Sequence, residues 1–110
     1  MTEPGGAERL GRHALAYLDR YAGSEASLRR VLTRRALRLC EPATVANLVD
    51  ATVARARGLG LVDDLAFAEA RARRLLGRGR PPAAVRAALA GKGIAAEVSD
   101  RALARIAGEA

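Results

Sequence analysis

The sequence has few aromatic residues, one cysteine and one histidine. Only 3% of its 110 residues are aromatic, none is tryptophan, and Cys40 and His13 are the single representatives of their types. One cysteine cannot build an intramolecular disulfide framework, which is the usage expected in a reducing cytosol. The sequence also lacks the HxxxH, DxD and CxxC spacings of metal sites and any nucleophile–base pair. We therefore expect no metal, no cofactor, no catalytic residue and no enzymatic activity.

Long apolar runs are also missing. No stretch approaches the roughly 18 apolar residues of a membrane span. The first residues, "MTEPGGAERLGRHALAYL", lack the basic region and the following apolar run of a secretory signal. The sequence therefore predicts a cytoplasmic protein with no membrane partner.

Arginine and alanine are abundant instead. Lys+Arg is 19 against Asp+Glu 12, so the net charge is +7, and Lys92 is the only lysine. Arginine makes bidentate contacts with phosphates and carboxylates, which favours a polyanion or an acidic protein surface as the partner. Alanine supplies much of the 50% hydrophobic content. Each helix can thus bury only a thin stripe, and we expect an elongated body of modest stability.

Apolar residues recur with the period of a helix in every long segment. The apolar stripes run from Leu10 to Tyr21, Leu28 to Leu39, Val45 to Val53, Ala68 to Leu76, Val85 to Leu89 and Val98 to Ile106. Glycines and prolines separate the stripes, and no useful length of sequence alternates as a strand would. The predicted fold class is all-α.

The helices form an internal repeat. Residues 18–32 superpose on 75–89 at an offset of 57, and the third helix continues the match at an offset of 50, with Asp50 against Asp100. Such a pattern is typical of tandem units that each pack on a neighbour. We predict a disordered tail over residues 1–8, a first three-helix repeat over 9–58 and a second over 59–110, in a monomer.

Two adjacent carboxylates, Asp63 and Asp64, stand at the start of the second repeat. As an N-cap, Asp63 can accept hydrogen bonds from backbone N–H groups of the helix that follows, and Asp64 then lies in the first turn, where the helix dipole favours an anion. Val62 and Phe67 have the spacing of a hydrophobic staple. Because the chain offers no partners for a metal or acid–base site, we interpret the pair as the start of a helix.

The second half of the chain contains the entry motif "GLVDDLAFA" and the element "GKGI". Through these two elements it resembles the RecX family of regulators of the RecA recombinase, and upstream "ALAYLDRYAGSEASLRRVL" resembles the first repeat of that family. The motif positions expected to be structural are Gly60, Asp63, Asp64, Phe67, Ala68, Lys92, Gly93 and Ile94. The family usually carries a third repeat, so the resemblance implies a two-repeat form. It also implies a helical regulator that binds RecA filaments, inhibits them, binds DNA weakly, and so affects recombination, DNA repair and the SOS response.

Basic residues form rows on two of the predicted helices. The residues expected to contact the partner or DNA are Arg29, Arg30, Arg34 and Arg38, then Arg71, Arg74 and Arg78, with Lys92. A solvated helix face explains each row alone, whereas two rows at corresponding places in a chain of charge +7 favour a polyanionic partner. A free-standing, basic, helical nucleic-acid-binding protein is the alternative to a RecA regulator. The scarcity of aromatics argues against the usual stacking surface of single-strand binders.

Overall fold

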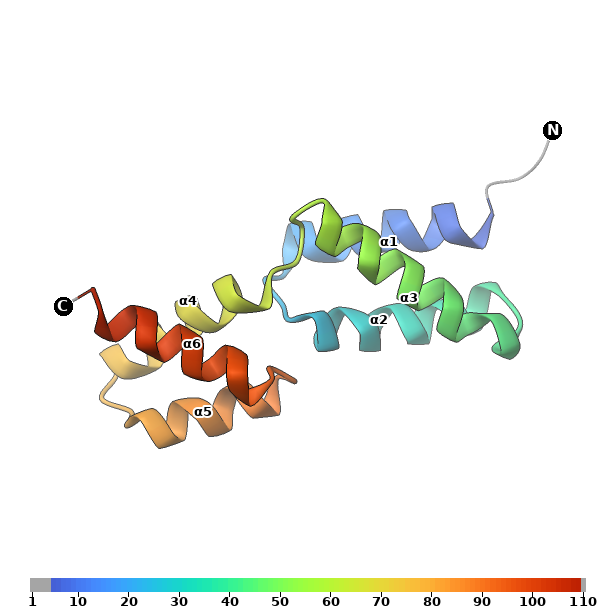
Figure 1. The fold of residues 1–110 in the computed structure, drawn as a ribbon. Helices are drawn as coiled ribbons and strands as arrows, with labels where there is room; N and C mark the ends of the chain where they lie inside the picture. The colour runs from blue at the N-terminus through green and yellow to red at the C-terminus, as the bar shows by residue number, and fades with distance from the viewer. Residues whose placement is uncertain (1–4, 110) are drawn as a thin grey trace. The chain divides into compact units, whose positions relative to one another are not determined.

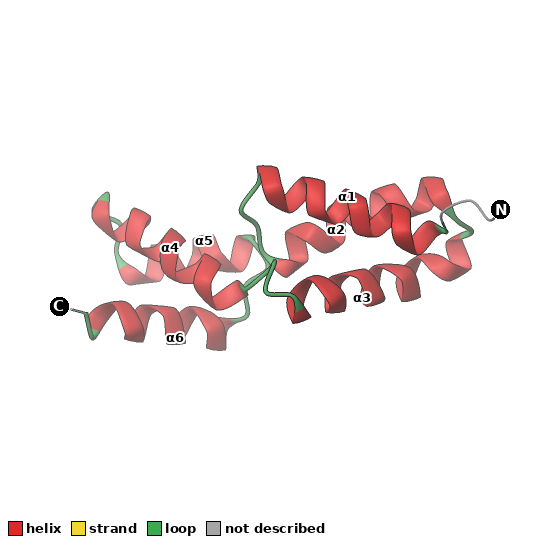
Figure 2. Cartoon of the chain, turned by 90° about the horizontal axis from the view of Figure 1, so that it is seen from above, coloured by secondary structure: helices red, strands yellow, loops and turns green. Residues whose placement is uncertain are grey.

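The computed structural model describes residues 5–109 and contains six α-helices in that range, with no strand. Figures 1 and 2 show the helices and the short loops that join them. Their bounds are α1 Gly6–Arg20, α2 Glu25–Leu39, α3 Pro42–Gly58, α4 Asp64–Gly77, α5 Pro82–Gly91 and α6 Ala96–Ala107. The all-α class predicted from the sequence is confirmed.

None of the helices in the described part of the chain has both the length and the apolar character needed to cross a membrane.

The first compact unit consists of α1, α2 and α3, which pack against one another in all three pairings. Its core contains the completely buried side chains of Leu10, Leu28, Leu32 and Val53. Leu28 and Leu32 are four residues apart, so they lie on one face of α2. Burial of this face holds the three helices together, because short isolated helices are marginal in water.

The second compact unit consists of α4, α5 and α6, with its most extensive packing between α4 and α6. Its core combines Val85 and Leu89 of α5 with three fully buried alanines. Those alanines are Ala68, Ala72 and Ala102. Alanine at the contact lets two helix backbones approach closely, but it buries little apolar area. This unit therefore has a thinner core than the first.

The two units divide after Val62, later than the boundary expected after residue 58. Val62 is buried with the core residues of the first unit, whereas Phe67 packs against the core of the second. Each of the two side chains of the expected staple therefore packs in its own unit.

The predicted tail over residues 1–8 is wrong in its second half. Residues 1–4 lie outside the described part of the chain, and α1 already begins at Gly6, with Gly5 as its N-cap. Glu8 stands in the first turn, where its negative charge interacts favourably with the helix dipole. Gly6 also lies near Leu48 of α3, because a Cβ placed there would be 3.4 Å from that side chain.

The helix starts follow the chemistry of their first residues. Ser24 and Asp63 are N-caps whose side-chain oxygens accept hydrogen bonds from the N–H groups of Ser27 and Ala66, each at 3.1 Å. This confirms the cap predicted at Asp63. Prolines occupy the first positions of α3 and α5, where a backbone N–H has no intrahelical acceptor.

Three helices end in the same glycine turn. Gly60, Gly79 and Gly93 have φ angles of 72°, 84° and 79°, and they follow α3, α4 and α5. After α5, the N–H of Ile94 donates to the carbonyl of Leu89 at 3.0 Å, and the N–H of Gly93 donates to the carbonyl of Ala90 at 2.9 Å. This pair of bonds defines a Schellman motif, which favours glycine at the left-handed position.

Replacement of Gly93 by alanine should destabilise the protein, because a Cβ is unfavourable at a φ angle of 79°. We expect Gly93→Ala to lower the free energy of unfolding by about 1–2 kcal/mol, measured by urea denaturation followed by circular dichroism. Gly91→Ala is the matched control, since Gly91 is helical and has open space around it. The control should be neutral or stabilising. Equal effects of the two substitutions would contradict this account of the turn.

Candidate nucleic-acid interface

The arginine row of the first unit lies on the outer face of α2. Arg30, Arg34 and Arg38 are all exposed. Each follows a buried core residue (Leu28, Leu32 and Ala36) by two positions, which is about 200° around the helix axis. Within residues 5–109 none of the three forms an ion pair, so their guanidinium groups face solvent without a carboxylate partner.

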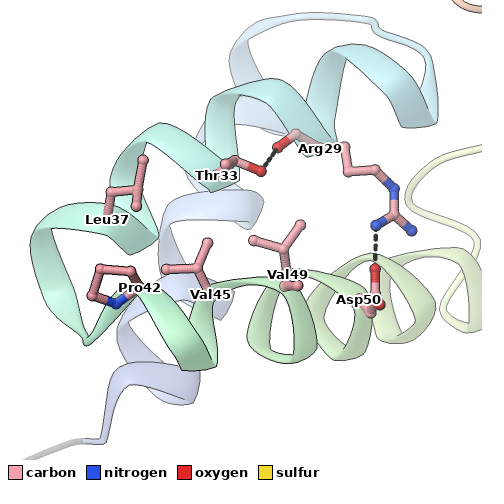
Figure 3. A pocket seen from close by; sticks show the side chains of 8 residues that line it. Arg29, Thr33, Leu37, Pro42, Val45, Val49 and Asp50 are labelled. Carbon is pink, nitrogen blue, oxygen red and sulfur yellow. Dashed lines mark hydrogen bonds and ion pairs between the residues drawn. The ribbon is translucent and has the colours of Figure 1, made fainter.

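Arg29 lies beside this row but has an internal partner. Its guanidinium forms an ion pair and hydrogen bond with the carboxylate of Asp50 on α3, as Figure 3 shows. The hydroxyl of Thr33 donates to the carbonyl of Arg29 at 2.7 Å. Below them Leu37, Val45 and Val49 line a shallow hollow of about 320 Å³. Arg29 thus links α2 to α3. The spacing of residues in the sequence could not indicate this contact.

The row expected on α4 is less uniform. Arg74 and Arg78 are exposed and have no ion pair within the described range. Arg71 is only half-exposed, and its Nε atom is buried without a hydrogen-bond partner among the described residues. The stem of Arg71 therefore packs against the unit, and only its end can face a partner. The free positive charge on α4 is concentrated at Arg74 and Arg78.

Arg73, which lies between Arg71 and Arg74 in the sequence, belongs to an internal network of charges. Its guanidinium is paired with Glu109, and Arg105 of α6 lies 3.1 Å from Glu69 of α4. The hydrogen bond with Glu109 raises the pKa of Arg73 above its ordinary value, so this residue stays charged. The Arg105–Glu69 pair connects α4 with α6, and the Arg73–Glu109 pair connects α4 with the residues that follow α6.

One ion pair recurs in both units. Arg86 of α5 lies 2.9 Å from Asp100 of α6. Arg86 and Asp100 are the residues that the sequence repeat aligns with Arg29 and Asp50. In each unit an arginine on the second helix therefore reaches a carboxylate on the third. The two units share this contact in addition to their helix order.

The family-like motif residues have structural positions. Gly60 and Gly93 form Schellman turns. Ala68 and Ile94 are buried in the core of the second unit. Lys92 is exposed at the C-cap of α5. The motif thus describes how helices start, pack and end.

The two tyrosines of the first unit differ in burial. Tyr17 packs against the core of the first unit, but Tyr21 is 53% exposed, with its ring centroid 5.3 Å from that of Tyr17. The two tyrosines therefore form a contact between one core side chain and one exposed side chain. Within residues 5–109 no three or more His, Cys, Asp or Glu side chains are grouped so that they could hold a metal ion.

An apolar groove in the first unit was not indicated by the periodicity. Leu15, Leu59 and Leu61 are large, exposed and line a hollow between α1 and α3. The available signal was the position of Leu15, which lies outside the stripe of Leu10, Ala14, Tyr17 and Leu18.

Comparison with known proteins agrees with this geometry. Residues 63–103 match the family described as "RecX, second three-helix domain", and they include α4 and α5 and most of α6. The chain is also 37% identical over 94 residues to "Regulatory protein RecX" of Myxococcus xanthus (strain DK1622). The chain belongs to the RecX family.

The aligned region covers 81% of this chain and 50% of the Myxococcus RecX protein, so the chain spans about half the length of this curated relative. No solved structure matches the chain significantly. The family match begins at Asp63, which is also the first residue of the second unit.

Asp63 of the RecX-like motif should contribute to the stability of the protein. We expect Asp63→Ala to cost about 0.5–2 kcal/mol, because the N–H of Ala66 loses its acceptor. Asp63→Ser, which retains an N-cap oxygen, should recover most of the loss. Thermal melts of the three proteins measure this. If Asp63→Ser were as unstable as Asp63→Ala, the carboxylate itself would have a role that capping does not explain.

Proposed function

We propose that this chain regulates the RecA recombinase by binding the RecA–DNA filament, and that it inhibits filament growth or activity. Membership in the RecX family supports this proposal. Such a regulator would modulate recombination, DNA repair and the SOS response, and it would act without a catalytic step of its own. The observation that carries the proposal is the unpaired arginine on the outer face of both units.

The geometry of these arginines suits a phosphate backbone. Arg30, Arg34 and Arg38 are spaced four residues apart, so their Cα atoms advance by about 6 Å along the axis at each step. Guanidinium groups bind phosphate oxygens through two parallel hydrogen bonds. These arginines form no ion pair with a carboxylate among the described residues, so binding a polyanion breaks no internal ion pair.

A free-standing nucleic-acid-binding protein is the second candidate. The net charge of +7 and the two arginine faces support it equally. Single-strand binders usually stack bases on several aromatic side chains, whereas here Tyr21 is the one large aromatic that the described surface exposes. We therefore expect contact with bare DNA to be weak and made through phosphates.

Binding to bare DNA should depend steeply on salt and little on sequence. If about four phosphates are neutralised, the plot of log K against log[salt] should have a slope of about −3 to −4. Fluorescence anisotropy with labelled single-stranded and duplex oligonucleotides of two unrelated sequences measures the slope. Strong preference for one duplex that persists at high salt would instead indicate base readout.

Charge reversal on either row should weaken the effect on RecA. We expect Arg30→Glu with Arg34→Glu, and separately Arg74→Glu with Arg78→Glu, to reduce inhibition of RecA ATPase on single-stranded DNA at least tenfold, about 1.4 kcal/mol. These exposed residues contribute little to the cores, so the melting temperatures should change only slightly. Arg71 is left unchanged because of its buried Nε atom.

A matched control carries the same change in net charge away from the two rows. Arg20→Glu with Arg101→Glu replaces one exposed arginine on α1 and one on α6. This protein should inhibit RecA as well as the wild type does. If the row variants match the wild type, the arginines are solvated faces only; if the wild type has no effect on RecA, the proposed function is wrong.

A further inference from the structure

A groove in the first unit runs between α1 and α3, with a volume of about 710 Å³. All the residues that line it belong to the first unit. Its walls are lined mainly by small and apolar side chains, with one arginine on the α3 side. The lining includes Ala7, Gly11 and Leu15 of α1, Ala51 and Arg55 of α3, and Leu59, which is the C-cap of α3.

Three leucines of this groove are unusually exposed for residues of their size. Leu15 is 52% exposed, Leu59 62% and Leu61 41%. All three line the same groove, so they form one apolar patch rather than scattered surface residues. Contiguous exposed apolar surface beside polar residues is characteristic of a protein interaction site.

The shape of the groove fits an α-helix. Ala7 and Leu15 are eight residues apart on α1, so this wall extends for about 12 Å, or two helical turns. Alanine and glycine on the walls leave room for another backbone to approach. A helix with apolar side chains at i, i+4 and i+7 would place them against the three leucines, as amphipathic helices do in other grooves.

The charges of the groove select among possible occupants. Arg12 and Arg55 both line it, both are exposed, and within residues 5–109 neither forms an ion pair; Glu8 is the one carboxylate of the lining. A second copy of this chain would bring its own charge of +7 to this basic rim. A nucleic acid would satisfy the arginines but would leave the leucines without apolar contacts. An acidic amphipathic helix offers carboxylates to the arginines and apolar side chains to the leucines.

We propose that this groove binds an amphipathic helix of a partner protein that carries acidic side chains beside its apolar stripe. The leucines supply the buried contact area, and Arg12 and Arg55 pair with carboxylates that flank the stripe. This site is separate from the arginine row of α2, and it does not require that the row bind RecA or DNA.

A peptide display library tests the occupant directly. The library fixes leucines at i, i+4 and i+7 of a helical peptide and lets the flanking positions be Glu, Lys or Ser. Selection on the 110-residue chain should enrich Glu at the flanking positions. Selected peptides, labelled with fluorescein, are then titrated with the wild type and variants by anisotropy, and circular dichroism checks that each variant is folded.

The variants separate the groove from the rest of the surface. Leu15→Gln with Leu59→Gln, and Arg12→Glu with Arg55→Glu, should each weaken peptide binding at least tenfold. Leu37→Gln is the control, because Leu37 is equally exposed, at 54%, but lies on α2 outside this groove. The control should bind as the wild type does.

Three results would overturn the proposal. Enrichment of Lys, or of no residue, would remove the acidic partner; selected peptides that bind both groove variants normally would place the site elsewhere. Sedimentation that shows a wild-type dimer abolished by Leu15→Gln with Leu59→Gln would make a second copy the occupant. None of these results bears on RecA inhibition, so this proposal and the proposed function fail independently.

Discussion

The thin apolar stripe that each helix buries is the constraint on which the rest of the structure depends. With small side chains at the contacts, three-helix units of this length bury little apolar area and must gain stability at the helix ends and surfaces. The N-caps at Ser24 and Asp63 and the glycine turns at Gly60, Gly79 and Gly93 meet this need. The RecX-like motif is concentrated at these positions, which accounts for its being mostly structural.

The arginines fall into two groups that differ in whether the guanidinium has a carboxylate partner. In one group the guanidinium is paired with a carboxylate on another helix of the same unit, as in Arg29 with Asp50 and Arg86 with Asp100. In the other the guanidinium has no such partner in the described range, as in Arg30, Arg34 and Arg74. The first group supports the fold, and the second gives each unit a basic outer face.

The fold could be predicted from the sequence to the extent that it depends on local signals. Apolar periodicity, the cap at Asp63 and the prolines of α3 and α5 are all local, and the helices follow them. The start of α1 at Gly6 could not be predicted, because two adjacent glycines usually indicate a loop, whereas here Gly6 is the first residue of the helix and lies close to Leu48 of α3.

The candidate interface was less predictable because its composition depends on tertiary contacts. Spacing along α2 places Arg29 beside Arg30, but only the position of α3 decides that Arg29 meets Asp50. Burial of the Arg71 Nε atom and exposure of Tyr21 likewise depend on neighbouring helices. Sequence patterns thus identified the basic helices, and the packing of each unit determined which of their side chains are free.

Arginine footprinting would test most directly whether the two groups of arginines have different roles. Phenylglyoxal modification of the protein, alone and bound to RecA filaments on single-stranded DNA, can be measured for each arginine by mass spectrometry. Our account predicts that the filament protects Arg30, Arg34, Arg38, Arg74 and Arg78, while Arg29 and Arg86 react equally in both states. Protection confined to Arg29 and Arg86, or no protection at any of these residues, would contradict it.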